Sequence, residues 1–525
     1  MSFKNELTYM RLVEAKEEEK YHETYESAVR LVKEDFAKEQ VLPNIINGKD
    51  VSTGSKFEKR SPADVSFLMA RLCKGSKEDV SKAVKAANEA FKSWSRTDFL
   101  QRVEIFEKAA RMASDHKYEL AAMLTFDNGK NRHEALADID EAIDFMNFYA
   151  SEMRRNDGYA TPLPPAFKNE KAMSFLRPFG VWAVICPFNF PVAISIGMAT
   201  AAMITGNTVV VKPSTLAPYT LHKMFRILQE AGLPPGVANF VAGSGKEVGE
   251  PLVSHPDVEG IVFTGSKAVG FDIIRNSVRE HPVPVIAEMG SKNPVIVTLD
   301  ADLEKAANGV IASAFGFGGQ KCSAASRVYV HSRIKDDFEK ELVKRTKKLN
   351  VAHPALRESS FGPIIEEAKV EDYLKYVAMG KEAGKVLCGG RRLTQGYLRN
   401  GFYVAPTIIS GLPRDHWLMK NELFMPILCT QGYDRLEEAV EMANSSVYGL
   451  TAGIFSQDDE EVDYFFNHIQ SGVVYANRGR GACTGAIVGA QSFVGWKASG
   501  STGKGTGGVW YLQQFLREQT RTVVL

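Results

Sequence analysis

The chain has 525 residues, a formal net charge of +1 and a composition that is 44% hydrophobic and 24% charged. This is the composition of an ordinary globular chain with large cores, and at about 100–200 residues per domain it predicts roughly three or four structural units. The balanced charge excludes a chain built to coat nucleic acid or an anionic membrane, since both need an excess of cations.

The first 40 residues predict a charged helix. One face of "YESAVRLVKEDF" is expected to carry the apolar side chains Tyr25, Val29, Leu31 and Val32. The N-terminus lacks the apolar stretch of a secretory signal and is too acidic for a mitochondrial transit peptide. Because no apolar run is long enough to cross a bilayer, we expect a cytoplasmic protein without a membrane partner.

After residue 40 the chain predicts a hairpin, a helical region and a projecting arm. The stretch "PNIINGKDV" (43–51) favours a β-hairpin, because Asn-Gly between apolar runs makes a tight turn. Helical periodicity dominates from Ser76 to Ser151. Residues 158–180 are Pro-rich and then strand-like, which is typical of an arm rather than of a core.

The middle of the chain alternates buried strands with helices. The apolar runs of strand length are "VWAVICPF" (181–188), "NTVVVKP" (207–213), "ANFVAG" (238–243), "EGIVFTGS" (259–266) and "PVIAEMG" (284–290). Runs without polar alternation are typical of parallel strands that helices cover on both faces. The expected fold class is therefore α/β, with a doubly wound Rossmann-type sheet that binds ligands at the carboxyl ends of its strands.

A second α/β unit begins near residue 290 with the strand "NPVIVTLD". Asp302 is expected to cap a helix with an apolar stripe at helical spacing, made of Leu303, Ala306, Ala307, Val310, Ile311, Ala314 and Phe315. Glycines then open the loop "FGFGGQKCSAASR" (315–327). The C-terminal "REQTRTVVL" is typical of a strand with nothing of its own to pair with.

Cys322 is the cysteine best suited to chemistry. The six cysteines, at 73, 186, 322, 388, 429 and 483, show no CxxC spacing and no His/Cys cluster, so they favour a reducing compartment and predict no metal site. The other five are interpreted as inert small hydrophobic residues. Cys322 follows glycines and Lys321, which predict an open loop whose N–H groups and cation favour the thiolate.

Two further residues predict a catalytic constellation. Glu288 ends an apolar strand, where apolar surroundings would raise its pKa and make it a base near neutrality. Asn189 follows a buried strand and precedes a helix, so its amide can point into the same crevice. Taken alone, Glu288 is equally well an exposed strand-end acid, and Asn189 a helix cap.

Two glycine-rich stretches follow strands and open helices. Neither "GSGKEVG" (243–249) nor "FTGSKAVG" (263–270) is a GxGxxG or Walker motif, and each alone is more typical of a turn. Their positions nevertheless suit anion binding at helix N-termini.

The ordered set "PFNFP", "VVVKPS", "FTGS", "AEMGSKNP", "GQKCSAASR", "NELFMP" and "VGWKASGSTGKG" resembles the aldehyde dehydrogenase superfamily over about residues 40–525. One branch is particularly similar, the 1-pyrroline-5-carboxylate dehydrogenases, which oxidise L-glutamate γ-semialdehyde. The resemblance to this branch is carried by "DNGKNRHEALADIDEAIDF", by "TGAIVGAQSF", by the serine after Cys322 and by the long acidic N-terminal extension.

The resemblance implies a covalent oxidation. Cys322 would attack the aldehyde, and the Asn189 amide and the Cys322 N–H would hold the resulting oxyanion. Hydride would leave to the cofactor and give a thioester. Glu288 would then activate the water that hydrolyses it.

The resemblance also implies a nicotinamide cofactor. Lys212 and Glu422 would hold its riboses, Gly265 and Ser266 would hold its pyrophosphate, and Phe424 would pack near the nicotinamide. The remaining implied contacts are Ile185, Pro187, Ser214, Thr215, Gly245, Gly249, Phe263, Thr264 and Gly290.

The cofactor is expected to be NADP or NAD. Many members carry a glutamate three residues after the lysine, which would repel a 2′-phosphate. This chain has Thr215, which beside Lys212 would accept one, so NADP use is expected.

For the substrate, the resemblance implies a carboxylate anchor formed by Ser323 and the backbone of Gly485 and Ala486. Phe190 and Phe493 would sandwich the aliphatic stem. Glu134 would accept from the ammonium group. Val494 and Met425 depart from glycines common in the family and would reshape the substrate mouth.

Alternatives remain open at this point. The same chemistry could act on 2-oxoglutarate semialdehyde or glyceraldehyde, and a remoter alternative is an inactive structural or binding protein on the same scaffold. We expect a homo-oligomer, at least a dimer. The expected domains are a cofactor-binding domain (1–157 and 181–288), a catalytic domain (289–500) and an oligomerisation arm and tail (158–180 and 501–525).

Overall fold

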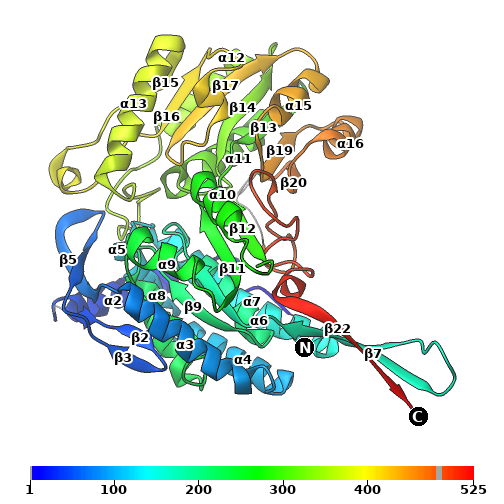
Figure 1. The fold of residues 1–525 in the computed structure, drawn as a ribbon. Helices are drawn as coiled ribbons and strands as arrows, with labels where there is room; N and C mark the ends of the chain where they lie inside the picture. The colour runs from blue at the N-terminus through cyan, green and yellow to red at the C-terminus, as the bar shows by residue number, and fades with distance from the viewer. Residues whose placement is uncertain (1–2, 39, 480–486) are drawn as a thin grey trace.

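The computed structural model describes residues 3–38, 40–479 and 487–525, and its chain forms two α/β units and a projecting β arm (Figure 1). The first unit is built on a mixed sheet. Its described strands run in the order β12-β11-β8-β9-β10-β2-β3. They are β2 (Asn44–Ile46), β3 (Lys49–Val51), β8 (Val181–Ile185), β9 (Thr208–Lys212), β10 (Ala238–Phe240), β11 (Val258–Gly265) and β12 (Val285–Met289).

The strands from β12 to β10 are parallel, which confirms the doubly wound prediction, and the predicted hairpin β2–β3 adds an antiparallel edge. Its turn residues Asn47 and Gly48 both have positive φ, at 52° and 71°, as a tight hairpin turn requires. The helices of this unit are α1 (Thr8–Glu14), α2 (Glu18–Phe36), α3 (Lys77–Trp94), α4 (Phe99–Asp115), α5 (Lys117–Asn128), α6 (Arg132–Arg155), α7 (Ala193–Ile204), α8 (Tyr219–Glu230), α9 (Glu250–Val253) and α10 (Lys267–Asn276).

One prediction for the N-terminal helices is wrong. In α2, Tyr25, Ala28, Val32 and Phe36 are buried at helical spacing, whereas Leu31 is 55% exposed. Leu31 lies six positions after Tyr25, about 600° around the helix, and so points away from the buried face.

In the second unit, helices cover another mixed sheet. Its described strands run in the order β15-β16-β17-β14-β13-β19-β20, and the β15–β16 pair is antiparallel. They are β13 (Asn293–Val297), β14 (Ala325–His331), β15 (Lys385–Cys388), β16 (Thr407–Ser410), β17 (Ile427–Tyr433), β19 (Thr451–Phe455) and β20 (Val473–Ala476). Its helices are α11 (Leu303–Phe315), α12 (Lys335–Thr346), α13 (Glu367–Ala383), α14 (Trp417–Lys420), α15 (Leu436–Asn444) and α16 (Asp459–His468). Asp302 caps α11 as predicted, accepting from the Lys305 N–H.

The arm is a sheet of β6 (Ala160–Leu163), β7 (Glu170–Pro178) and β22 (Leu516–Val524), and it projects from the molecule (Figure 1). The prediction that the C-terminal strand has nothing of its own to pair with is wrong. β22 pairs antiparallel with β7 of the same chain, from Leu516 opposite Pro178 to Val524 opposite Glu170. The partner strand β7 lies more than 330 residues earlier in the chain, so local sequence could not predict this pairing.

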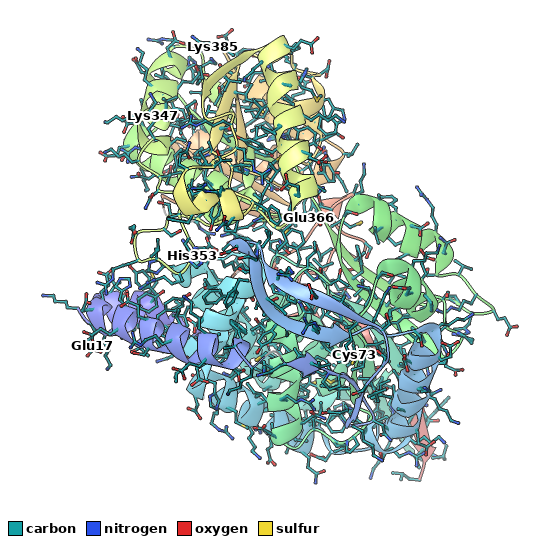
Figure 2. The ribbon with its side chains drawn as sticks, turned by 90° about the vertical axis from the view of Figure 1, so that its left-hand side faces the viewer. Glu17, Cys73, Lys347, His353, Glu366 and Lys385 are labelled. Atoms are coloured by element: carbon teal, nitrogen blue, oxygen red, sulfur yellow. The ribbon has the colours of Figure 1, made fainter. Side chains whose placement is uncertain are left out.

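The loop between α12 and α13 joins the two units on the side of the N-terminal helices. Figure 2 shows His353 and Glu366 between the upper unit, which carries Lys347 and Lys385, and the lower unit. Arg357 pairs with Glu19 at 2.9 Å across this junction. Two short sheets complete the described strands: β1 (Val41–Leu42) with β4 (Lys56–Ser61) and β5 (Asp64–Cys73), and β18 (Tyr448–Gly449) with β21 (Trp496–Lys497). No helix in the described part of the chain is both long and apolar enough to span a membrane.

Candidate active site

Cys322 sits in a rigid loop between α11 and β14. Gly318 and Gly319 have φ of 62° and 69°, and a Cβ on Gly319 would lie 2.5 Å from the Met425 carbonyl oxygen, so this turn requires glycine. The Asn293 Nδ2 donates to the carbonyls of Cys322 and Ala324, at 2.7 and 2.9 Å. The loop is therefore held from several sides.

The predicted openness of this loop is wrong, and so is the predicted thiolate. The residues from Phe317 to Lys321 are buried, and Cys322 itself is half-buried. Burial raises the pKa of the Cys322 thiol well above its usual range, and Glu422 and Glu288 raise it further, while the N–H groups of Cys322 and Ser323 oppose the shift. Lys321 does not serve the sulfur, because its Nζ lies 2.7 Å from Glu134.

Glu288 lies near the carboxyl end of β12 and is clamped by the C-terminal segment. Its backbone bridges Gly500, and the next N–H, of Met289, donates to the Ser499 carbonyl at 2.8 Å. The side chain is 8% exposed, and its Oε2 has no hydrogen-bond partner among the described residues. Burial raises its pKa well above the usual value, which confirms the predicted direction.

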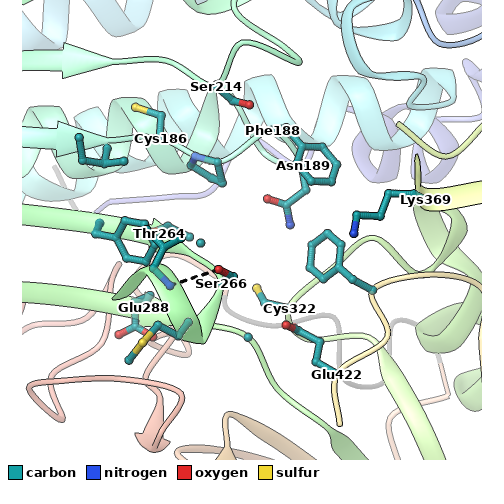
Figure 3. Close-up of a pocket in the computed structure, with 18 of the residues that line it drawn as sticks. Cys186, Phe188, Asn189, Ser214, Thr264, Ser266, Glu288, Cys322, Lys369 and Glu422 are labelled. Atoms are coloured by element: carbon teal, nitrogen blue, oxygen red, sulfur yellow. Dashed lines mark hydrogen bonds between the residues drawn. The ribbon is translucent and has the colours of Figure 1, made fainter. Parts of the chain in front are cut away.

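Asn189 lies between β8 and α7, as predicted. Its Nδ2 donates to the Gln320 carbonyl at 3.1 Å, two residues before Cys322, which leaves the second N–H of that amide free to serve the cleft. Asn128 supports it by donating to the Asn189 carbonyl at 3.3 Å. Cys322, Glu288 and Asn189 thus line one cleft, and Figure 3 shows the Asn189 and Cys322 side chains facing the same space.

We call this cleft of 420 Å³ the open cleft. It lies at the carboxyl ends of β8, β11 and β12, where a doubly wound sheet binds its ligands. Its walls include ten residues predicted to contact the cofactor, namely Ile185, Pro187, Ser214, Phe263, Thr264, Gly265, Ser266, Gly290, Glu422 and Phe424. Ser266 caps α10, so the N–H groups of a ten-residue helix face this end of the cleft.

Four other residues that were predicted to contact the cofactor do not line the open cleft. Lys212 ends β9, its Nζ donates to the Pro213 carbonyl at 2.9 Å, and its stem lies 3.4 Å from the position of a Gly249 Cβ. Thr215 is half-buried in the loop after β9. Gly245 and Gly249 bound a five-residue π-helix.

Glu422 and Gly290 form a close contact on the far wall of the open cleft. The Ser291 N–H donates to the Glu422 Oε1 at 2.9 Å, and a Cβ on Gly290 would lie 1.9 Å from its Oε2. Burial raises the pKa of Glu422 to about 7. Beside it, the Phe424 ring packs edge-on against Phe188 with centroids 5.7 Å apart.

Behind Cys322 lies a much smaller space of 70 Å³, the inner chamber. Its described lining is Glu141, Phe145, Phe190, Ile194, Thr264, Glu288, Cys322, Ser323, Phe493 and Thr506. It therefore brings together Ser323, Phe190 and Phe493 of the predicted substrate site. Gly485 and Ala486 lie outside the described residues.

A third space of 650 Å³, the outer cavity, opens beyond the inner chamber between α6 and the N-terminal segment. Its described lining is Asn5, Leu7, Tyr9, Met10, Asn131, His133, Glu134, Leu136, Ala137, Asp140, Glu141, Asp144, Phe190, Ala312, Lys321, Ile487 and Val488. Glu134 lies here, with its pKa lowered because Lys321 and Lys130 outweigh burial. The predicted ammonium acceptor is thus already paired with a lysine.

Sequence reasoning missed several residues of these walls. Cys186 and Phe188 line the open cleft and belong to the quoted strand "VWAVICPF", so strand-end position could have identified them. Lys369 and Tyr376 come from α13 of the second unit, and no sequence motif indicated that they would lie in this cleft. Glu141 lies seven positions after Glu134 on α6, a spacing that places both on one helix face.

A half-buried thiol, a buried carboxyl and oriented amide donors around one cleft are the parts that acyl chemistry requires. Comparisons with known proteins agree. Residues 50–521 match the model of the aldehyde dehydrogenase family. A curated protein of Bacillus cereus, 1-pyrroline-5-carboxylate dehydrogenase, is 40% identical over 93% of both chains.

Two solved structures are similar to the whole chain. 1-Pyrroline-5-carboxylate dehydrogenase from Thermus with bound NAD has a TM-score of 0.93 and 35% identity over 100% of this chain and 99% of that one. Proline utilization A from Bdellovibrio bacteriovorus inactivated by N-propargylglycine has the same TM-score and identity, and the match covers 53% of that longer chain.

Proposed function

Because the chain belongs to the aldehyde dehydrogenase family, we propose that it oxidises L-glutamate γ-semialdehyde, the open form of 1-pyrroline-5-carboxylate, to L-glutamate. The observation that best supports this choice of substrate is the lining of the inner chamber. Two aromatic rings, Phe190 and Phe493, and the Ser323 hydroxyl line it beside Cys322, which suits a short aliphatic stem ending in a carboxylate.

The first step is attack of the Cys322 sulfur on the aldehyde carbon. Because burial favours the thiol, its proton must leave to solvent through the open cleft as the ligand binds or reacts. The developing oxyanion would accept from the free Asn189 N–H and from the Cys322 N–H, two donors held in place by hydrogen bonds of the loop.

Hydrolysis of the thioester is assigned to Glu288. A carboxyl with a raised pKa beside Cys322 can take a proton from water near neutral pH. The water oxygen would then bond to the acyl carbon, the C–S bond would break, and the Cys322 sulfur would leave. The small, partly apolar chamber limits competing water.

The residues present fit a nicotinamide cofactor, which when bound would supply the acceptor for the two electrons and proton lost by the aldehyde carbon. Gly290 leaves space that a Cβ would close, the Glu422 carboxylate could accept from ribose hydroxyls, and the α10 N-terminus suits the pyrophosphate.

We further propose that NADP is accepted, because Thr215 presents no carboxylate to a 2′-phosphate beside Lys212. Thr215→Glu should therefore raise the NADP Kd by about tenfold or more and leave the NAD Kd within about threefold, measured by fluorescence titration. Equal changes for both cofactors would contradict this assignment.

Self-association is proposed through the arm. Val523 and Val524 of β22 and the following Leu525 are 59, 65 and 71% exposed, so apolar side chains are uncovered at the end of this narrow sheet, where a second copy would cover them. Light scattering on a chain lacking residues 517–525 should show a smaller assembly than the full chain. An unchanged mass would contradict this interface.

An aldehyde panel with NAD and with NADP tests the function. Glutamate semialdehyde should give the highest kcat/KM, ahead of glutaric semialdehyde, 2-oxoglutarate semialdehyde and glyceraldehyde. A higher value for an aldehyde without a carboxylate would overturn the substrate assignment, whereas no turnover of any aldehyde would point to the inactive scaffold.

A further inference from the structure

The loop between α5 and α6 carries a buried lysine to which the chemistry above gives no role. α5 ends at Asn128, Gly129 turns the chain with a φ of 83°, and Lys130 follows shortly before α6. The Lys130 Nζ lies 2.7 Å from the Asp138 Oδ2, and both side chains are 0% exposed. Because desolvation offsets much of the attraction in such a pair, its value to the protein depends on what else the two groups contact.

The ammonium of Lys130 also contacts an aromatic ring of the substrate site. Its Nζ lies 3.3 Å from the centroid of the Phe190 ring, a distance that only an approach over a face of the ring allows. A second lysine near this ring, Lys321, is 5.9 Å from the centroid and is paired with Glu134. Phe190 lines both the inner chamber and the outer cavity. The ring therefore has the Lys130 cation on one face and presents its other face or its edge to those spaces.

The same loop fixes the backbone of the turn that carries Phe190. The Asn128 Nδ2 donates to the carbonyls of Phe188 and Asn189, at 3.2 and 3.3 Å. The Asn128 Oδ1 accepts from the Lys130 N–H at 3.2 Å. The residues on the N-terminal side of the Phe190 ring are thus held by an amide, and the ring itself by a cation.

Asp138 fixes the other end of this turn. While its Oδ2 holds Lys130, its Oδ1 accepts from the Ala193 N–H at 2.6 Å, at the first residue of α7. One carboxylate therefore orients the cation under the Phe190 ring and the helix that follows the ring. Neither contact depends on a bound ligand, so the arrangement exists before the substrate arrives.

Resting on the proposed function, we propose that Lys130 is a positioning residue for the substrate: its ammonium, oriented by Asp138, fixes the Phe190 ring as a wall of the inner chamber and so sets the length of aliphatic stem that the chamber accepts. The chamber has a volume of only 70 Å³, so a small turn of this ring changes its shape strongly. A ring that is free to turn would have to be ordered by each substrate that binds, which costs affinity.

A second ring defines the competing interpretation. Phe317 lies 5.1 Å from the Lys130 Nζ and belongs to the loop before Cys322. If the cation acted mainly on that loop, its loss would affect every aldehyde, because all of them react at Cys322. If it acts on Phe190, its loss affects only aldehydes whose stem lies against that ring.

The double variant Lys130→Met/Asp138→Asn tests the proposal without burying an unpaired charge. It keeps the side-chain volumes, and the new amide oxygen can still accept from the Ala193 N–H. For glutaric semialdehyde, which has the stem and the carboxylate but no ammonium, KM should rise roughly 10- to 30-fold while kcat stays within about threefold. For acetaldehyde, which has no such stem, both should stay within about threefold, and this turnover shows that the variant is folded.

Two further variants cover the case in which this one does not fold. Lys130→Gln/Asp138→Asn replaces the ion pair by an amide–amide hydrogen bond and should show the same split between the two aldehydes. Lys130→Arg keeps a cation that can stack on the ring and pair with Asp138, so it should retain most of the low KM for glutaric semialdehyde.

A double-mutant cycle with Phe190→Leu supplies a second readout. Phe190→Leu alone should raise the KM for glutaric semialdehyde, and adding Lys130→Met/Asp138→Asn should change it by no more than about twofold further, because the ring on which the cation acts is gone. Independent effects in this cycle, an unchanged KM for glutaric semialdehyde, or an equal loss for acetaldehyde would overturn the inference and leave the proposed function standing. A wild type with a higher kcat/KM for acetaldehyde than for glutamate semialdehyde would instead remove the proposed function.

Discussion

The two sides of the Cys322 loop are built on different principles. The open cleft has a volume of 420 Å³ and its walls come mostly from the ends of parallel strands and the turns after them. The inner chamber has a volume of 70 Å³ and rests on faces of the helices α6 and α7 and on segments near the C-terminus. One side is a wide groove that receives a large ligand, and the other is a small enclosure.

Their electrostatics differ as well. Beside the inner chamber, the lysines Lys130 and Lys321 are already committed to Asp138 and Glu134 inside the protein. On the open cleft, Glu422 accepts one backbone N–H and keeps its second oxygen for a ligand. The lysines beside the chamber are thus neutralised within the protein, whereas Glu422 keeps an oxygen for a polar cofactor that must come and go.

Glu288 borders both sides, and its removal should separate them most sharply. Glu288→Gln should lower steady-state kcat by about 10²–10⁴-fold, because the thioester loses its base. The first turnover should still produce close to one equivalent of reduced cofactor, seen by stopped-flow absorbance. Cys322→Ala serves as the control and should give no burst. A burst lost to the same degree in Glu288→Gln would place the carboxyl's role before the thioester rather than after it.

Asn189 should show the next largest effect. Its free N–H acts only on the oxyanion, so Asn189→Ala should reduce kcat/KM by about 10²–10³-fold with little change in cofactor Kd. Asn128→Ala removes a neighbouring amide whose hydrogen bonds are all to backbone groups, and it should cost much less. If the two variants lost activity equally, Asn189 would act by holding the turn and not by donating to substrate.

The same contrast explains what the sequence could predict. The strands, and the cleft residues that follow them, can be predicted from local sequence. Each strand is an apolar run, and Asn189 or Glu288 stands where such a run ends. Because carboxyl ends of parallel strands meet at one edge, such residues are brought together by the fold class itself. Eight of the ten predicted cofactor contacts in the open cleft, all except Glu422 and Phe424, lie there for this reason.

The substrate side resisted prediction because it depends on pairings distant in sequence. Lys321 follows the glycines before Cys322 and was expected to favour a thiolate, but its partner is 187 residues away on α6. The glycine loop reads as open, yet it is buried because segments 363–365 and 425 pack against it. Burial of this kind reversed the expected pKa of Cys322 and left Glu141 unnoticed.

Gly290→Ala should break the open cleft and spare the inner chamber. A Cβ 1.9 Å from the Glu422 Oε2 must displace that carboxylate. We expect the cofactor Kd to rise roughly 10- to 100-fold, the equivalent of about 1–3 kcal/mol for a forced repacking. Fluorescence titration measures the Kd, and the alkylation rate of Cys322 by iodoacetamide reports whether the thiol loop is intact. Gly54→Ala, where an added Cβ meets nothing within 4 Å, controls for the loss of a glycine.

The smallest effect concerns pH and again distinguishes the two sides. The pKa of Glu422 is about 7, and only its carboxylate form accepts fully from ribose hydroxyls. Protons therefore compete with the cofactor, so the Kd should fall as the pH rises from 6 to 8, by at most about tenfold per unit below the pKa and hardly at all above it. Glu422→Gln should bind more weakly at pH 8 and show a flat profile. A wild-type Kd that rises with pH would mean that Glu422 binds the cofactor in its protonated form. The open cleft would then bind its ligand without a carboxylate charge, and this difference from the chamber behind Cys322 would disappear.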